Sequence, residues 1–113
     1  MPNQNLKHCV PCEGGIPPLS PSEISARLKK LKAWNLERNS ITKTYTFIDF
    51  RRAISFVNEV SDVAEFEGHH PDLNIHNWNK VTVTLQTHAI KGLSENDFIM
   101  AERIDQILEE TKE

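Results

Sequence analysis

The chain lacks a long apolar run and a strong excess of either charge. Its 113 residues include 13 Lys and Arg against 16 Asp and Glu, which gives a formal net charge of −3. This balance offers no broad basic surface for phosphate backbones, so we expect no nucleic-acid partner. No apolar stretch approaches the roughly 20 residues of a membrane span, and the first residues lack the charged-then-apolar order of a secretory signal. We therefore expect a cytoplasmic protein that makes no membrane contact.

Cysteine is also scarce, because the chain contains only Cys9 and Cys12. A single Cys-x-x-Cys supplies two ligands, whereas a structural zinc site needs four. A redox motif would open a helix in a βαβ unit, but prolines and glycines surround this pair. We predict a reduced pair in an extended arm that covers residues 1–19. A metal shared between two chains is the alternative.

Residues 20–113 predict a single α+β domain with the element order α-β-β-α-β-β-α. Ser20, Pro21 and Glu23 have the order of a capping box at a helix start, and Asp49 and Gly68 bracket a second, long helix. Alternating apolar and polar residues predict strands over 34–37, 41–47, 73–76 and 81–87, and β-branched residues are frequent in the second and fourth of them. Because strands that follow each other along the chain could pair as hairpins, we expect a four-stranded antiparallel sheet with the helices packed on one face.

Apolar periodicity predicts which helix faces are buried. A 3.6-residue period is typical of a helix with one face on the core. In the long helix it marks Phe50, Ala53, Ile54, Val57, Val60 and Ala64. In the last helix, which Ser94 opens, it marks Met100, Ala101, Ile104, Ile107 and Leu108.

Two adjacent histidines, His69 and His70, follow the end of the long helix. The negative end of the helix dipole and the nearby Glu65 and Glu67 favour protonated imidazoles there, which could donate protons near neutral pH. Glu65 stands four residues before His69, so it would orient that ring if helical geometry continues as far as His69. The alternative is that these residues form only a polar helix terminus.

Three further residues are of interest if the fold brings them to the histidine pair. His88 ends an alternating strand on its polar face. Asp97 stands three residues after Ser94, where a carboxylate completes a helix cap, and we expect capping to be its main role. Trp78 lies in the turn between two strands, where it either covers the end of the sheet or offers a flat wall to an aromatic ligand.

Metal binding by these histidines is the weaker hypothesis. Side chains of adjacent residues on a helix point about 100° apart, which suits a single ion poorly. The i, i+4 histidine spacing of helical metal sites is absent. We therefore predict no metal at this site.

Taken together, the polar residues form a multi-point pattern. It runs Glu65, three residues, His69-His70-Pro71, six residues, Trp78, nine residues, His88, eight residues and Asp97. From about residue 18 to the C-terminus the chain resembles the pterin-4a-carbinolamine dehydratases, both in this pattern and in element order. The arm with its Cys-x-x-Cys resembles an extension found on bacterial and plastid members.

The resemblance implies an activity that needs only acid–base chemistry. Members dehydrate 4a-hydroxytetrahydropterin to quinonoid dihydropterin, which regenerates the pterin after aromatic amino-acid hydroxylation, without a cofactor. The implied catalytic residues are His69, His70 and His88, with His69 and His88 as the acid–base pair and His70 shaping the pocket. The implied substrate-binding residues are Glu65, Gly68, Trp78, Gln86, Thr87 and Asp97. A homodimer or homotetramer is implied as well.

The chain departs from the animal members of the family at two positions. Gly68 replaces an aspartate and Leu73 replaces a tryptophan, so some substrate contacts are expected to differ. Two other functions stay open. Animal members also act as dimerisation partners of a transcription factor, which suggests a protein-binding scaffold, and another pterin could be the substrate, for example in molybdenum-cofactor metabolism.

Overall fold

The computed structural model describes Cys9 and residues 17–111, with side chains described as far as residue 108. The elements along the chain are α1 (Pro21–Leu28), β1 (Asn35–Glu37), β2 (Ser40–Thr46), α2 (Phe50–Glu67), β3 (Asp72–His76), β4 (Lys80–Leu85), the short 3₁₀ helix η1 (His88–Ile90) and α3 (Glu95–Thr111). The predicted order is confirmed, with η1 as an addition. Cys12 and most of the predicted arm lie outside the described residues.

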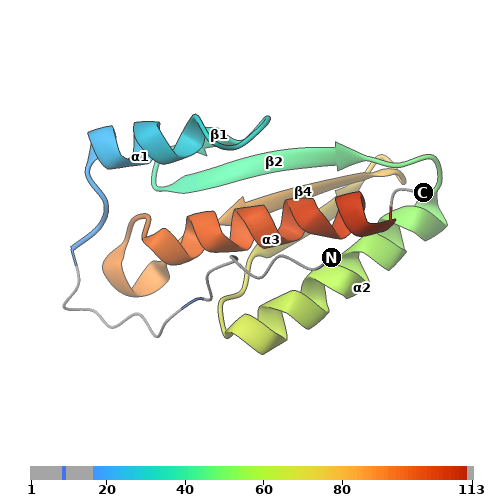
Figure 1. The fold of residues 1–113 in the computed structure, drawn as a ribbon. Coiled ribbons are helices and arrows are strands. Elements are labelled where there is room, and N and C mark those ends of the chain that lie inside the picture. The colour runs from blue at the N-terminus through green and yellow to red at the C-terminus, as the bar shows by residue number, and fades with distance from the viewer. Residues whose placement is uncertain (1–8, 10–16, 112–113) are drawn as a thin grey trace.

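The four strands form one antiparallel sheet in the order β1-β2-β4-β3 (Figure 1). Hairpins join β1 to β2 and β3 to β4, but β2 pairs with β4, and α2 connects β2 to the edge strand β3. The expectation that strands adjacent in the sequence pair throughout the sheet is therefore wrong for β2 and β3. Eighteen helical residues intervene between β2 and β3, so these two strands cannot form a hairpin. The central strand that pairs with β2 is β4 instead.

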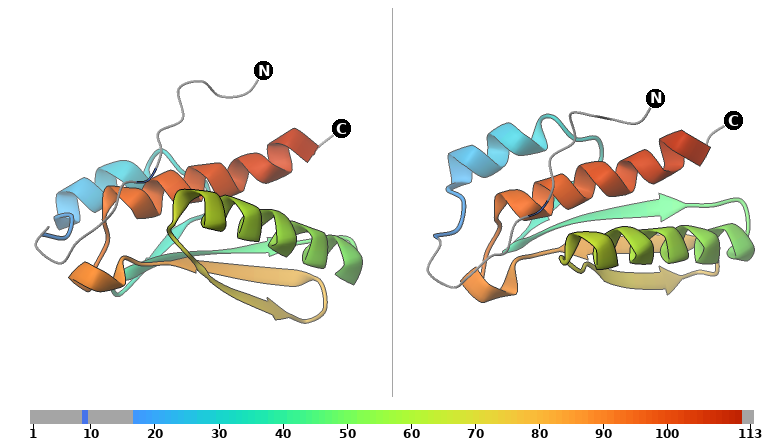
Figure 2. Two further views of the ribbon diagram at one scale, coloured as in Figure 1. Left: turned by 90° about the horizontal axis from the view of Figure 1, so that it is seen from below. Right: turned by 60° about the horizontal axis from the view of Figure 1, so that its bottom comes forward.

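The helices lie on one side of the sheet, as predicted. Figure 2 shows α2 and α3 side by side over the same sheet face, with α1 next to α3 near the β1 edge. The covered face carries a fully buried set of sheet residues: Ile41, Val81, Val83 and Leu85. The opposite face carries cross-strand threonine pairs, in which Thr42 meets Thr84 and Thr44 meets Thr82 through their hydroxyls. The fold is thus α+β, with a single core between the sheet and the helices.

The predicted helix boundaries follow from caps that are present in the structure. Ser20 accepts from the backbone N–H of Glu23, and the Glu23 carboxylate accepts from the backbone N–H of Ser20, which completes the capping box. Asp49 caps α2 by accepting from the N–H of Arg52 at 2.8 Å. Each cap satisfies a backbone donor that the first helical turn leaves without an intrahelical acceptor.

The buried face of α2 differs in part from the predicted one. Ala53, Val60 and Ala64 are buried as expected, but Phe50 and Ile54 are 53% and 36% exposed. Phe56 is buried instead, and its ring packs 4.7 Å from Tyr45 and 5.1 Å from Phe47 between ring centroids. Aromatic rings on and just after β2 thus select the stripe of α2 that faces the sheet, which the helical period alone did not identify.

The predicted stripe of α3 is confirmed, and a polar network ties the same helix to β2. Met100, Ala101 and Ile104 are fully buried. Further along α3, Asp105 accepts from the indole N–H of Trp34 at 3.0 Å, from the Tyr45 hydroxyl at 2.5 Å and from the Lys43 ammonium at 2.8 Å. Burial, then the hydrogen bond to Asp105, raises the pKa of Tyr45 far above its ordinary value, so the phenol stays neutral.

Candidate active site

The end of α2, the end of β4 and the start of α3 meet at one end of the molecule and enclose a pocket of about 450 Å³. This volume lies in the range of small-molecule sites. The segment around Gly68 supplies one side and the segment after β4 supplies the other. The lining residues are Cys9, Glu67, Gly68, His69, His70, Gln86, Thr87, His88, Ala89 and Asn96. All three candidate catalytic histidines thus lie around one pocket.

Gly68 turns the chain out of α2 so that the histidines leave the helix. It adopts a left-handed conformation with φ of 71° and donates its N–H to the carbonyl of Ala64 at 2.8 Å, which closes the helix. A glycine adopts this conformation without the strain that a Cβ would cause. The residues after it therefore do not continue the helical geometry.

This turn overturns the predicted pairing of Glu65 with His69. Glu65 contacts His70 instead, with Oε2 2.8 Å from Nε2, and both side chains are largely exposed. The i, i+4 expectation assumed that helical geometry extends to residue 69, but the helix ends at Glu67. His69 is oriented by a residue distant in the sequence.

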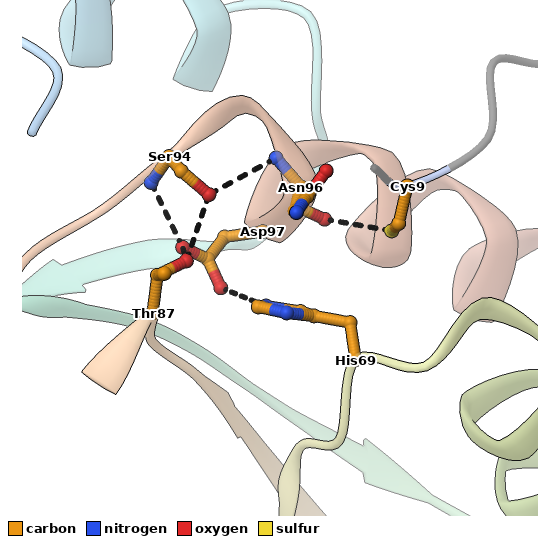
Figure 3. A network of polar contacts seen from close by, with 6 residues as sticks. All are labelled: Cys9, His69, Thr87, Ser94, Asn96 and Asp97. Atoms are coloured by element: carbon orange, nitrogen blue, oxygen red, sulfur yellow. Dashed lines mark hydrogen bonds and ion pairs between the residues drawn. The ribbon is translucent and has the colours of Figure 1, made fainter. Parts of the chain in front are cut away.

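That residue is Asp97, whose carboxylate is completely buried. Its Oδ1 lies 2.7 Å from His69 Nε2, and its Oδ2 accepts from the backbone N–H of Ser94 at 3.0 Å and from the Thr87 hydroxyl at 2.7 Å (Figure 3). The bond to Ser94 N confirms the predicted capping role. The bond to His69 adds a second role, because it holds the ring of a side chain that is only 12% exposed.

The donor of each hydroxyl hydrogen bond in this network can be assigned. Thr87 donates its only hydroxyl proton to Asp97, so the Ser94 hydroxyl, 2.7 Å away, must donate to Thr87. The Ser94 oxygen in turn accepts from the backbone N–H of Asn96 at 3.2 Å. Asp97 thus receives two donors at one oxygen, and a third from His69 is consistent with an ionised carboxylate.

An ionised Asp97 fixes the tautomer of His69. The ring must donate from Nε2 to the carboxylate, which leaves Nδ1 as the nitrogen that can exchange a proton with a ligand. A buried carboxylate that orients an imidazole in this way is a recurrent arrangement in acid–base catalysis. The pair can therefore hold the imidazole of a pocket-lining residue in a fixed orientation.

His88 reaches the pocket by a route different from the predicted one. The strand ends at Leu85, and His88 opens η1 rather than continuing the polar face of β4. Thr87 and Gly92 pair across this loop, with Thr87 N donating to Gly92 O at 2.9 Å. The loop turns the chain at the end of the strand and leaves His88 exposed on the pocket wall.

Trp78 does not line the pocket. It lies in the turn between β3 and β4 with positive φ and is 61% exposed. Since β3 begins just after the histidines and runs away from them, the turn lies at the opposite end of the sheet (Figure 1). Within this one chain, Trp78 is not a wall of the histidine pocket.

Four lining residues were not among the predicted catalytic or substrate-binding residues: Cys9, Glu67, Ala89 and Asn96. Glu67 lies at the last position of α2 and Asn96 in the first turn of α3, and both neighbour predicted site residues. Their proximity to Gly68 and Asp97 is the signal that could have suggested them. Cys9 comes from the arm and could not be placed by any local pattern.

The described part of the chain offers no preformed metal site. Within it, no group of three or more His, Cys, Asp or Glu side chains is arranged to hold a metal ion. No helix in the same residues has the length and apolar character needed to cross a membrane.

Comparison with known proteins gives a consistent result. The family model for pterin 4 alpha carbinolamine dehydratase matches residues 17–107. A protein of Azoarcus sp. (strain BH72), named "Putative pterin-4-alpha-carbinolamine dehydratase", is 48% identical over 105 residues, which cover 91% of this chain and 89% of that protein. A protein of Nitrosospira multiformis with the same name is 44% identical over 91% of this chain and 90% of its own length.

Solved structures agree with this result. The crystal structure of a transcriptional coactivator/pterin dehydratase from Brucella melitensis superposes with a TM-score of 0.76 at 35% identity, over 80% of this chain and 97% of that one. A pterin dehydratase-like RuBisCO assembly factor of the alpha-carboxysome has a TM-score of 0.55 at 21% identity, over 66% of this chain and 84% of that one, and shows likeness of fold alone. On the extent of the family match and of these identities, the chain belongs to the pterin 4 alpha carbinolamine dehydratase family.

Proposed function

We propose that this protein dehydrates a 4a-hydroxytetrahydropterin to quinonoid dihydropterin and water. The observation that carries the proposal is the buried Asp97–His69 pair, with 2.7 Å between Oδ1 and Nε2, at a pocket that His70 and His88 also line. Family membership supports the same reaction class, a hydro-lyase.

The reaction requires one proton to be given and one to be taken. The bond between C4a and its hydroxyl oxygen breaks, and a protonated imidazole supplies the proton that lets the oxygen leave as water. A ring N–H of the pterin loses its proton to a neutral imidazole, and no net oxidation takes place. His69 and His88 are the proposed pair, because both lie on the pocket and Asp97 holds the His69 ring in a fixed orientation.

The other polar residues around the histidines are proposed to bind and shape the site. His70, held by Glu65, lies beside Gly68 on the same wall of the pocket. Thr87 uses its hydroxyl on Asp97 and its N–H on Gly92, so its proposed part is to support Asp97. Gln86 lies next to it on the pocket wall and is the better candidate for a direct contact with the pterin.

We also propose that the protein assembles as a homodimer or homotetramer. Phe50 and Ile54 lie one turn apart on α2 and are exposed, and Ile48 just before the helix is 73% exposed. Apolar side chains that cluster on an outer face are typical of contact surfaces between chains. The pathway that we propose is the cytoplasmic recycling of tetrahydropterin after aromatic amino-acid hydroxylation.

A protein-binding scaffold is the second candidate. The same exposed apolar side chains of α2 favour it, and the Brucella relative is described as a transcriptional coactivator as well as a dehydratase. In this case the histidine pocket would be dispensable for the protein's role.

The test is the decay of the transient 4a-carbinolamine absorbance, with the substrate generated in situ, for wild type, His69→Ala and His88→Ala. We expect wild type to accelerate the decay and each variant to lose roughly 10²-fold or more in kcat, the low end of acid–base contributions. Circular dichroism checks that both variants fold. A wild-type chain no faster than buffer would refute the dehydratase and leave the scaffold as the function to test.

A further inference from the structure

Glu67 places a buried carboxylate directly beside the histidine turn. Its side chain is 2% exposed, although it occupies the last position of α2. Oε2 forms an ion pair with Arg103 on α3, 3.0 Å from Nε but without the alignment of a hydrogen bond, and Oε1 accepts from the backbone N–H of Cys9 at 2.8 Å. A carboxylate is rarely buried in a protein unless it is paired, so these contacts explain its position.

Two bridges therefore join the end of α2 to α3 on either side of Gly68. Glu67 binds Arg103, and two residues later His69 binds Asp97. The bridges flank the left-handed turn that carries His69 out of the helix. If the first bridge is lost, the final turn of α2 can shift relative to α3, and the distance from His69 to Asp97 then depends on the second bridge alone.

The same carboxylate also holds Cys9 on the pocket wall. The Cys9 backbone is bound to Glu67, and its thiol donates to the carbonyl oxygen of Asn96 at 3.6 Å (Figure 3). Cys9 is half-buried and lines the same pocket as His69. Burial, with Glu67 and Asp97 adding to it, raises the pKa of the thiol to about 12, so a neutral side chain faces the pocket.

We propose that Glu67, held by Arg103, is a positioning residue of this site: it fixes the turn that carries His69 and seats Cys9 as part of the substrate-binding wall. The proposal rests on the proposed dehydratase function. Two separable effects are expected. Disturbing the α2 turn lowers kcat through His69, whereas unseating Cys9 raises KM.

The first experiment compares Arg103→Gln, Arg103→Lys and the double variant Glu67→Gln/Arg103→Gln in the carbinolamine assay. We expect Arg103→Gln to lose roughly tenfold or more in kcat/KM, because it removes the Arg103 cation from the buried Glu67 carboxylate and small displacements of catalytic groups are costly. Arg103→Lys retains a cation and should recover most of the loss, and the double variant should be less impaired than the single one. Arg51→Gln, an exposed arginine at the other end of α2, is the control. Equal kinetics in Arg103→Gln and this control would overturn the proposal.

The second experiment tests the seating of Cys9 and does not depend on the enzymatic activity. In a Cys12→Ser background, Cys9 is the only thiol, and its rate of alkylation by N-ethylmaleimide is measured. We expect Arg103→Gln to raise that rate several-fold and a stable dihydropterin to lower it in the chain with Arg103 intact. An alkylation rate that is the same with and without Arg103 would refute the seating. A wild-type chain without dehydratase activity would instead refute the proposed function.

Two Cys9 variants test the contact between Glu67 and the Cys9 backbone if the Arg103 and Glu67 changes prevent folding. Cys9→Pro removes the N–H that Glu67 accepts and leaves the ion pair intact, whereas Cys9→Ala retains that N–H. We expect Cys9→Pro to raise KM more than Cys9→Ala does, with kcat close to wild type in both. Equal KM values in the two variants would overturn the role of the backbone contact.

Discussion

Replacing Asp97 by asparagine tests the core of the proposed mechanism. The carboxylate is completely buried and accepts from Ser94 N, from the Thr87 hydroxyl and from His69. In Asp97→Asn the single amide oxygen can retain the first two donors, and the amide group then turns its N–H toward His69 Nε2. Two donors cannot bond, so His69 must accept at Nε2 and carry its proton on Nδ1. The variant therefore selects the tautomer that cannot accept a proton from a ligand at Nδ1.

The Asp97→Asn change is expected to affect both the stability of the fold and the rate of the reaction, by different amounts. The fold loses a charge-assisted hydrogen bond and strengthens no other, so we expect a decrease of about 2 kcal/mol in the free energy of unfolding. The chemistry loses a correctly oriented acid–base group, which is worth about 10²–10⁴-fold in rate. A loss of 10²-fold corresponds to about 2.7 kcal/mol of activation free energy.

The assay compares kcat with stability in the same variants. Carbinolamine decay gives kcat, and urea unfolding followed by circular dichroism gives the free energy of unfolding. Asp105→Asn is the matched control, because Asp105 lies on the same helix and also accepts several hydrogen bonds, but its partners Trp34, Lys43 and Tyr45 do not line the pocket. We expect the control to lower stability and leave kcat near the wild-type value.

A double variant completes the test. If Asp97 acts through His69, then His69→Ala/Asp97→Asn should be no slower than His69→Ala alone, because residues that act as a unit are non-additive. The reasoning is refuted if Asp97→Asn keeps wild-type kcat, or if the two losses multiply.

Three further predictions rest on the described contacts. Gly68→Ala should lower the free energy of unfolding by about 1–2 kcal/mol in urea unfolding, because its φ of 71° is strained for a residue with a Cβ, and a smaller loss is expected for Gly68→Asn. The pKa of Cys9 is raised to about 12 from 9.0. The contribution of the neutral Cys9 thiol to the stability of the fold is therefore complete below pH 9.0 and is lost between pH 9.0 and about 12. Alkylation of Cys9 in the Cys12→Ser background should therefore be slower in the folded chain than in urea at pH 8, and equal rates would contradict the shift. Phe50→Glu/Ile54→Glu should reduce the mass measured by light scattering after gel filtration, and a mass unchanged from an oligomeric wild type would place the interface elsewhere.

Local signals in the sequence predicted most of the fold. The capping box at Ser20, the cap at Asp49 and the stop at Gly68 each depend on a backbone requirement that only a few residue types satisfy. The alternation along β4 likewise identified its buried face. The boundaries that these residues predict agree with the structure because each is set by neighbours within one turn or one strand.

The errors had different causes. The helical period of α2 allowed more than one apolar stripe, and contacts with Tyr45 and Phe47 selected the one that contains Phe56. The pairing of Glu65 with His69 assumed a continuous helix, whereas the turn at Gly68 directs His70 to Glu65. The first choice depended on contacts distant in the sequence, whereas the second followed from the local helix stop at Gly68, which the i, i+4 expectation did not take into account.

The sequence by itself determined which chemical groups are available: histidines after a helix stop, a histidine after a strand and a carboxylate in a helix cap. It also determined the family, because the spacing of these groups is specific. The tertiary structure decided which of them meet. His69 and Asp97 are 28 residues apart, and only the packing of α2 and α3 on one sheet face brings the imidazole to the carboxylate. The same packing places Glu67 of α2 against Arg103 of α3, because a buried charge is stable only beside a partner of opposite charge, however far apart the two residues lie in the sequence.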